Sequence, residues 1–191
     1  MSHRRVVVTG MGAVTPLGND LASSWDGIVN GRSGIGPVTH FDTTGFTTKI
    51  AGEIRNFDPT AFVSPKDAKK MEAFIHYGLA ASFMALDDSG LEITEANAER
   101  VGALIGSGIG GILGIEEQTA KYLEGGARKI SPFYVPSTII NMLPGQLSII
   151  RGLKGPNFSA VSACATSNHS IGVAMRMIQH GDADVMVAGG A

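Results

Sequence analysis

The sequence predicts an α/β protein in which strands alternate with helices. Apolar or β-branched runs typical of buried strands occur at 100–108, 157–163 and 183–190. Runs with the spacing of helices separate them, at 112–126 and 165–180. No linker, low-complexity segment or short repeat interrupts the 191 residues. We therefore expect one layered structure around a largely parallel or mixed sheet, with helices packed against it.

The remaining elements are predicted in chain order. "RRVVVTG" (4–10) is β-branched and ends at glycine, which predicts a buried strand. A short helix is expected over 19–31 with Asn19 as its cap. The segment 48–54 is an edge strand or an extended loop, and the clearest helix lies between 64 and 90. Further on, 131–152 is expected to form a loop and then a helix, which a proline would kink.

Two of these elements require neighbours. The helix at 165–180 carries apolar residues nearly all round, and the strand at 183–190 is apolar on both faces. We therefore expect residues 1–191 to be part of a larger domain. A complete small domain with a terminal core strand is the alternative.

Composition limits the function classes. With 43% hydrophobic and 17% charged residues, the chain can bury a sizeable core. A net charge of −2 gives no basic excess for nucleic acid. A single cysteine excludes an internal disulfide and fits a reducing compartment. Neither a signal peptide nor an apolar run of membrane-spanning length is present. The expected protein is cytoplasmic and binds neither nucleic acid nor membrane.

The glycine motif "GSGIGG" (106–111) matches the dinucleotide-binding fingerprint by its letters. That fingerprint also needs an acidic residue about 20 positions on, after a second strand. The corresponding region, "YLEGGARKIS", has no strand pattern before it. Close backbone packing is therefore the favoured interpretation, and we expect neither a cofactor nor a metal.

The lone cysteine, Cys164, stands between the predicted strand at 157–163 and the predicted helix at 165–180. Unpaired N–H groups and the dipole of a helix N-terminus favour a negative charge there, and therefore a thiolate. The same N–H groups suit an oxyanion on an attacked thioester. His169 lies five residues on, about 140° round a helix, so we expect a structural role for it. No catalytic histidine is evident.

Several blocks together resemble the β-ketoacyl-acyl carrier protein synthase II family, the elongating condensing enzymes of bacterial type II fatty acid synthesis. They are "RRVVVTGMG", "HFDTTGF", "KKMEAFIHYGLAA", "DSGLEITEANAERVGALIGSGIGG", "RKISPFYVPSTIINM" and "GDADVMVAGGA". "SACATSN" looks like the nucleophile motif and places the nucleophile at Cys164, whose backbone N–H would be one oxyanion-hole donor. The resemblance implies a thiolase-like fold: two similar halves stacked in five αβαβα layers, with residues 1–191 as the N-terminal half.

The resemblance also implies an activity and partners. The cysteine takes an acyl chain from acyl carrier protein, and malonyl-acyl carrier protein then loses carbon dioxide and attacks that acyl group. Two histidines and a lysine in the second half assist, so 1–191 alone is expected to be inactive. Ile109 would line the acyl pocket, and Tyr134 would reach into the partner subunit's acyl pocket in a homodimer. The docking patches for acidic carrier protein would be Lys66, Lys69, Lys70, Arg128 and Lys129. A non-catalytic acyl-binding or dimerisation subunit of the same fold is the alternative function.

Overall fold

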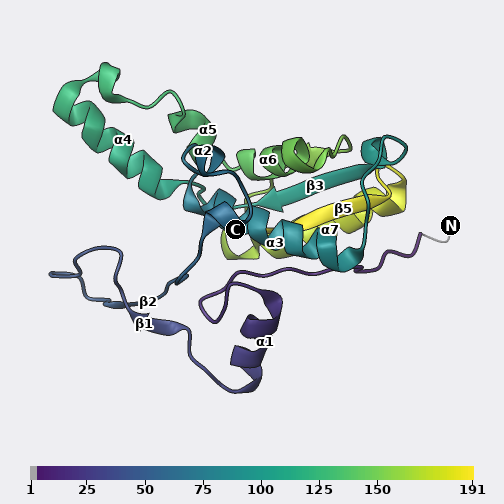
Figure 1. Ribbon diagram of the computed structural model, residues 1–191, viewed down its shortest axis with the longest axis horizontal. Helices are drawn as coiled ribbons and strands as arrows, with labels where there is room; N and C mark the ends of the chain where they lie inside the picture. Colours follow the sequence, from purple (N-terminus) through teal and green to yellow (C-terminus); the bar gives the residue numbers. More distant parts are fainter. Residues whose placement is uncertain (1–3) are drawn as a thin grey trace.

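The computed structural model describes residues 4–191, and a parallel three-stranded sheet lies at its centre (Figure 1). The strands are β3 (Val101–Gly106), β4 (Asn157–Phe158) and β5 (Val185–Gly190). Their order is β4-β3-β5, and β3 pairs with β5 along its whole length. Every residue of β3 is buried, as a central strand covered on both faces should be. The predicted α/β class is confirmed, and of the expected alternatives, a largely parallel or a mixed sheet, the described sheet is parallel.

Helices cover the two faces of this sheet. On one face, α3 (Ala73–Ser89) and α6 (Met142–Arg151) form the main apolar core together with alternate residues of β3. The opposite face carries α7 (Thr166–His180), whose first residue contacts the last residue of β3. Because successive strand residues point to opposite faces, β3 serves both helical layers.

The other elements surround this centre. Figure 1 shows α4 extending from one end of the sheet, near α5, while α1 and the β1–β2 pair lie along another side. Their bounds are α1 (Leu21–Val29), β1 (Ile35–Pro37), β2 (Ile50–Gly52), α2 (Pro65–Ala68), α4 (Ile112–Gly125) and α5 (Tyr134–Thr138). Single 3-10 turns are η1 (Pro59–Ala61), η2 (Ala98–Arg100), η3 (Ala127–Lys129) and η4 (Ala163–Ala165). Of the two alternatives for 48–54, the structure shows the strand, β2, which pairs antiparallel with β1.

The predicted buried strand at 4–10 is wrong for the described chain. The segment has no strand structure, and Val7 and Val8 are 61% and 75% exposed. It runs along α3 instead, so closely that a side chain at Gly10 would overlap the carbonyl oxygen of Ala85. A β-branched run forms a strand only where a neighbouring strand pairs with it, and no strand within 4–191 does so here.

Smaller differences follow from local capping. The cap of α1 is Asp20 rather than Asn19, because the Asp20 carboxylate accepts the N–H of Ser23. The helix expected between 64 and 90 is divided into α2 and α3. Pro144 lies in the first turn of α6, where N–H groups lack helical partners, so it does not interrupt the helix. The strand expected at 157–163 is only two residues long.

The helix after the cysteine, α7, is covered on only one side within the described residues, so the prediction that it needs further cover stays a prediction. One side of α7 packs on β3 and β5. Other apolar side chains of α7 remain uncovered within 4–191: Ile171 is 49% exposed, Val173 41% and Met175 39%. Such an exposed apolar surface is typical of an interaction site.

Candidate nucleophile site

Cys164 lies in η4, the single turn that leads directly into α7, and it is exposed. The preceding strand, β4, ends at Phe158, so the junction between strand and helix is longer than predicted. The predicted position at the entrance of a helix is nevertheless confirmed. A thiol at this position is accessible and lies close to the N-terminal end of the α7 dipole.

The turn that carries Cys164 is strained. Ala163 has a φ of +50°, in the left-handed region that L-residues other than glycine, asparagine and aspartate rarely adopt. Hydrogen bonds hold this conformation: the hydroxyl of Thr166 accepts the N–H of Ser162 at 2.9 Å and donates to the carbonyl of Ala163 at 2.8 Å. The backbone of the turn therefore has a defined shape.

The glycine motif lies directly against this turn. A Cβ at Gly106 would overlap both the carbonyl oxygen of Ala160 and a methyl group of Thr166. A Cβ at Gly108 would lie 4.0 Å from the Cα of Ala163. The predicted close backbone packing is confirmed. This packing also brings the loop of Ile109, a residue that is 63% exposed, to the turn at 162–166 that carries Cys164. We call this segment the nucleophile turn, after the predicted role of Cys164.

No histidine within residues 4–191 forms a hydrogen bond with Cys164, and His3 lies outside the described residues. The Nδ1 atom of His169 lies 2.5 Å from the hydroxyl of Ser162, as a structural histidine would. The Nε2 atom of His76 lies 3.0 Å from the carbonyl oxygen of Ala68, and burial lowers the pKa of His76. The site therefore contains an exposed cysteine and an ordered turn.

The predicted docking lysines and the segment of Tyr134 lie at the same end of the molecule. The Lys70 ammonium is 5.8 Å from the ring centroid of Phe133, which precedes α5, and 2.7 Å from the Asp67 carboxylate. This hydrogen bond is the main cause of the lowered pKa of Asp67. Lys70 is therefore already paired within the chain. The other predicted docking residues are exposed: Lys66, Lys69, Arg128 and Lys129. Tyr134 is half-buried.

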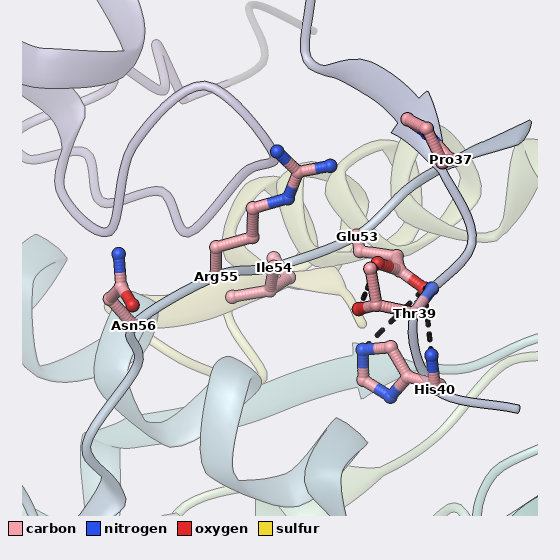
Figure 2. Close-up of a pocket in the computed structure, with 7 residues that line it drawn as sticks. All are labelled: Pro37, Thr39, His40, Glu53, Ile54, Arg55 and Asn56. Carbon is pink, nitrogen blue, oxygen red and sulfur yellow. Dashed lines mark hydrogen bonds and ion pairs between the residues drawn. The ribbon is translucent and has the colours of Figure 1, made fainter.

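A separate hollow lies beside the β1–β2 pair (Figure 2). Its lining residues are Pro37, Thr39, His40, Glu53, Ile54, Arg55 and Asn56, so Cys164 does not reach it. The Glu53 carboxylate accepts hydrogen bonds of 2.8 Å from both the N–H and the hydroxyl of Thr39. The N–H bond is the main cause of its lowered pKa. These bonds from Thr39 to Glu53 therefore stabilise the segment that follows β1.

Residues 4–191 contain no group of three or more His, Cys, Asp or Glu side chains placed to hold a metal ion. None of the helices in the same range has the length and apolar character needed to cross a membrane.

Two residues of the site were not predicted. Ser162 and Thr166 are small polar residues on either side of Cys164, and both hold the turn. Their hydroxyl groups gave no periodic or capping signal, because the bonds depend on the unusual backbone of Ala163. A pattern of side-chain types does not encode such a conformation.

The fold and the site define an α/β protein with an exposed cysteine at the entrance of a helix. The chain belongs to the β-ketoacyl synthase family, because the family model "Beta-ketoacyl synthase, N-terminal domain" matches residues 3–191. It is 59% identical to the 3-oxoacyl-[acyl-carrier-protein] synthase 2 of Vibrio harveyi and 50% identical to that of Coxiella burnetii. In both comparisons all of this chain is covered, and it spans 46% of the relative's length.

Solved structures show the same fold. One similar chain comes from "AntDE:AntF (apo): type II PKS acyl-carrier protein in complex with its ketosynthase bound to the hexaketide", with a TM-score of 0.86 and 27% identity. Another comes from "The ishigamide ketosynthase/chain length factor", with a TM-score of 0.85 and 31% identity. Each alignment covers all of this chain, and 52% and 48% of the solved chains. The predicted thiolase-like α/β fold is confirmed.

Proposed function

We propose that this chain is the nucleophile-bearing N-terminal half of a 3-oxoacyl-acyl carrier protein synthase. The whole enzyme would condense acyl-acyl carrier protein with malonyl-acyl carrier protein, with loss of carbon dioxide, in fatty acid elongation. The observation that carries the proposal is an exposed Cys164 in a strained, hydrogen-bonded turn at the start of α7. The relatives named above, which share up to 59% identity with the chain, support the substrate class.

The chemistry follows from the position of the sulfur. The Cys164 thiolate attacks the carbonyl carbon of an acyl thioester, and a negative charge develops on the carbonyl oxygen. The backbone N–H of Cys164 is one proposed donor to that oxygen. The carbon–sulfur bond to the carrier breaks, the carrier thiolate takes a proton, and the acyl group remains on Cys164.

The second step uses the malonyl thioester. Loss of carbon dioxide leaves a carbanion at its α-carbon, which attacks the acyl-Cys164 carbonyl and releases the cysteine thiolate. Two histidines and a lysine would assist from the part of the enzyme that corresponds to the second half of the relatives. For this reason, residues 1–191 on their own are expected to be inactive.

The remaining site residues have roles in binding. Ile109 would line the acyl pocket, because its loop packs against the nucleophile turn. Tyr134 would reach the acyl pocket of the partner subunit in a cytoplasmic homodimer. The surface formed by Lys66, Lys69, Lys70, Arg128 and Lys129 would attract acidic carrier protein, mainly by raising the association rate. One of the similar solved chains comes from a ketosynthase complex with acyl-carrier protein, which supports this partner.

The test is acyl transfer to the full-length protein. Incubation with acyl-acyl carrier protein should add the mass of the acyl group to the peptide that contains Cys164. The variant Cys164→Ala should take up no acyl group and elongate no chains, while His180→Ala, at the far end of α7, should behave as the wild type. Elongation by Cys164→Ala would refute the assignment. A protein that binds acyl chains but never forms the adduct would instead be the non-catalytic subunit.

A further inference from the structure

The nucleophile turn is tied to the body of α7 at a second point, beyond the bonds made by Thr166. Ser162 precedes the strained Ala163, and its hydroxyl lies 2.5 Å from Nδ1 of His169, one turn into α7. Its N–H meanwhile donates to the Thr166 hydroxyl. Ser162 is therefore held by two residues of the same helix, one through its backbone and one through its side chain.

The two attachments of Ser162 stabilise the unusual backbone conformation of Ala163. A non-glycine residue at φ +50° stores strain, and it persists only where the surrounding contacts over-determine it. Thr166 alone belongs to the first turn of α7, which is the part of a helix that frays most readily. His169 is the fourth residue of α7, so it extends the attachment to the end of this first turn, where helical hydrogen bonds begin.

We propose that His169 is a positioning residue for Cys164, and that its bond to Ser162 holds the sulfur at the opening of α7. The proposal rests on the proposed function in one respect: it takes Cys164 as the reacting group. His169 itself transfers no proton. Without its bond to Ser162, the turn samples conformations in which the sulfur leaves its position at the opening of α7, and attack by Cys164 becomes slower.

The experiment measures alkylation of Cys164 in the full-length protein by iodoacetamide at neutral pH, followed by mass spectrometry of the Cys164 peptide. The variant His169→Ala should react about 3- to 10-fold more slowly, the range expected for one lost hydrogen bond. His169→Asn should restore the rate to within about twofold, because its amide occupies the place of Nδ1. His169→Gln, whose amide reaches the place of Nε2, should not restore it.

Two further variants separate positioning from general stability. Ser162→Ala should slow alkylation as much as His169→Ala, and the double variant should be no slower than either one, as for two partners in one bond. His180→Ala is the matched control on the same helix and should alkylate as the wild type. If a single variant does not fold, the conservative His169→Asn and His169→Gln pair still decides, since only the place of the polar atom differs.

The positioning role would be overturned if Cys164 of His169→Ala were alkylated at the wild-type rate. Equal alkylation rates for His169→Asn and His169→Gln would also overturn it. Acyl transfer from acyl carrier protein is measured on the same samples. A wild type that takes no acyl group but shows the predicted alkylation pattern refutes the proposed function and supports the positioning role. If instead the wild type takes the acyl group and His169→Ala does not change the alkylation rate, the proposed function is supported and the positioning role is refuted.

Discussion

Arg100 holds Asp184 with two hydrogen bonds, from Nε to Oδ2 at 3.0 Å and from Nη2 to Oδ1 at 3.1 Å. Arg100 immediately precedes β3 and Asp184 immediately precedes β5, so the pair aligns the starts of two adjacent parallel strands. Arg4 adds a third contact to the same carboxylate at 2.6 Å. The Arg100 bond, followed by the Arg4 bond, lowers the pKa of Asp184 to about 2.

The variant Asp184→Asn should lose stability in a pH-dependent way. The folded-state pKa of about 2 lies below the ordinary 3.8, so the carboxylate stabilises the fold fully above pH 3.8. This contribution disappears as the pH falls towards 2. Urea unfolding at several pH values should therefore show the largest wild-type advantage near neutrality and a shrinking one below pH 4. High salt should reduce it, because all partners are exposed.

The control is Asp87→Asn, since Asp87 contacts Arg151 only once and at 3.5 Å. Its effect on the unfolding midpoint should be much smaller at every pH. An Asp184→Asn protein that unfolds at the same urea concentration as the wild type at neutral pH would show that the strand starts are aligned by other contacts.

Two helical glycines should respond in opposite directions to alanine. A Cβ at Gly78 in α3 would overlap the end methyl groups of Leu143, which is fully buried between α3 and α6. Gly78→Ala should therefore cost about 1–3 kcal/mol of unfolding free energy through overpacking. Gly145 in α6 has nothing within 4 Å of the Cβ position, so Gly145→Ala should stabilise by about 0.5–1 kcal/mol. Chemical denaturation of both variants gives the comparison. Equal changes in the unfolding free energy would mean that helix propensity, and not the close contact between α3 and α6, determines the effect of both substitutions.

These elements show what the sequence could reveal. The strand at β3 and the helices α3, α4 and α7 were predictable, because each has enough residues for its apolar pattern to distinguish strand from helix. The segment 4–10 has a strong strand pattern but runs along α3. Pairing is a property of a neighbour, and residue preferences alone do not report whether that neighbour is present.

In the candidate site too, the sequence could predict some features and not others. Cys164 was predictable as a lone thiol before a helix, and the glycine motif as a region of close packing. The φ of +50° at Ala163 was not, because alanine gives no sign of a left-handed conformation. The roles of Ser162 and His169 depend on that conformation, so their bond became visible only in three dimensions.

Gly106→Ala should disturb the nucleophile directly. The added methyl group would overlap a backbone oxygen, that of Ala160, which is harder to displace than the end of a side chain, and it would also press on Thr166. We expect a loss of about 1–3 kcal/mol in unfolding free energy and slower iodoacetamide alkylation of Cys164. Gly172→Ala is the control, because its Cβ position in α7 is open. If Gly106→Ala loses stability but Cys164 reacts at the wild-type rate, the turn is shaped independently of β3.

Charge reversal on the docking surface should weaken carrier-protein association specifically. The residues to change are Lys69 and Arg128, because both are exposed, whereas Lys70 is already paired with Asp67. Lys69→Glu combined with Arg128→Glu should lower kcat/KM for acyl-acyl carrier protein by about tenfold or more at low ionic strength, mainly through the association rate.

A short acyl thioester without a carrier protein should react with the double variant as fast as with the wild type. Lys154→Glu, which reverses the charge of an exposed lysine beside the start of β3, is the control for a charge reversal elsewhere on the surface. Because surface attraction is screened, the difference between double variant and wild type should narrow as salt rises from about 10 to 150 mM. A difference that does not depend on salt would point to a local change in the fold around α2 and η3, and equal rates with carrier protein would place its docking surface elsewhere.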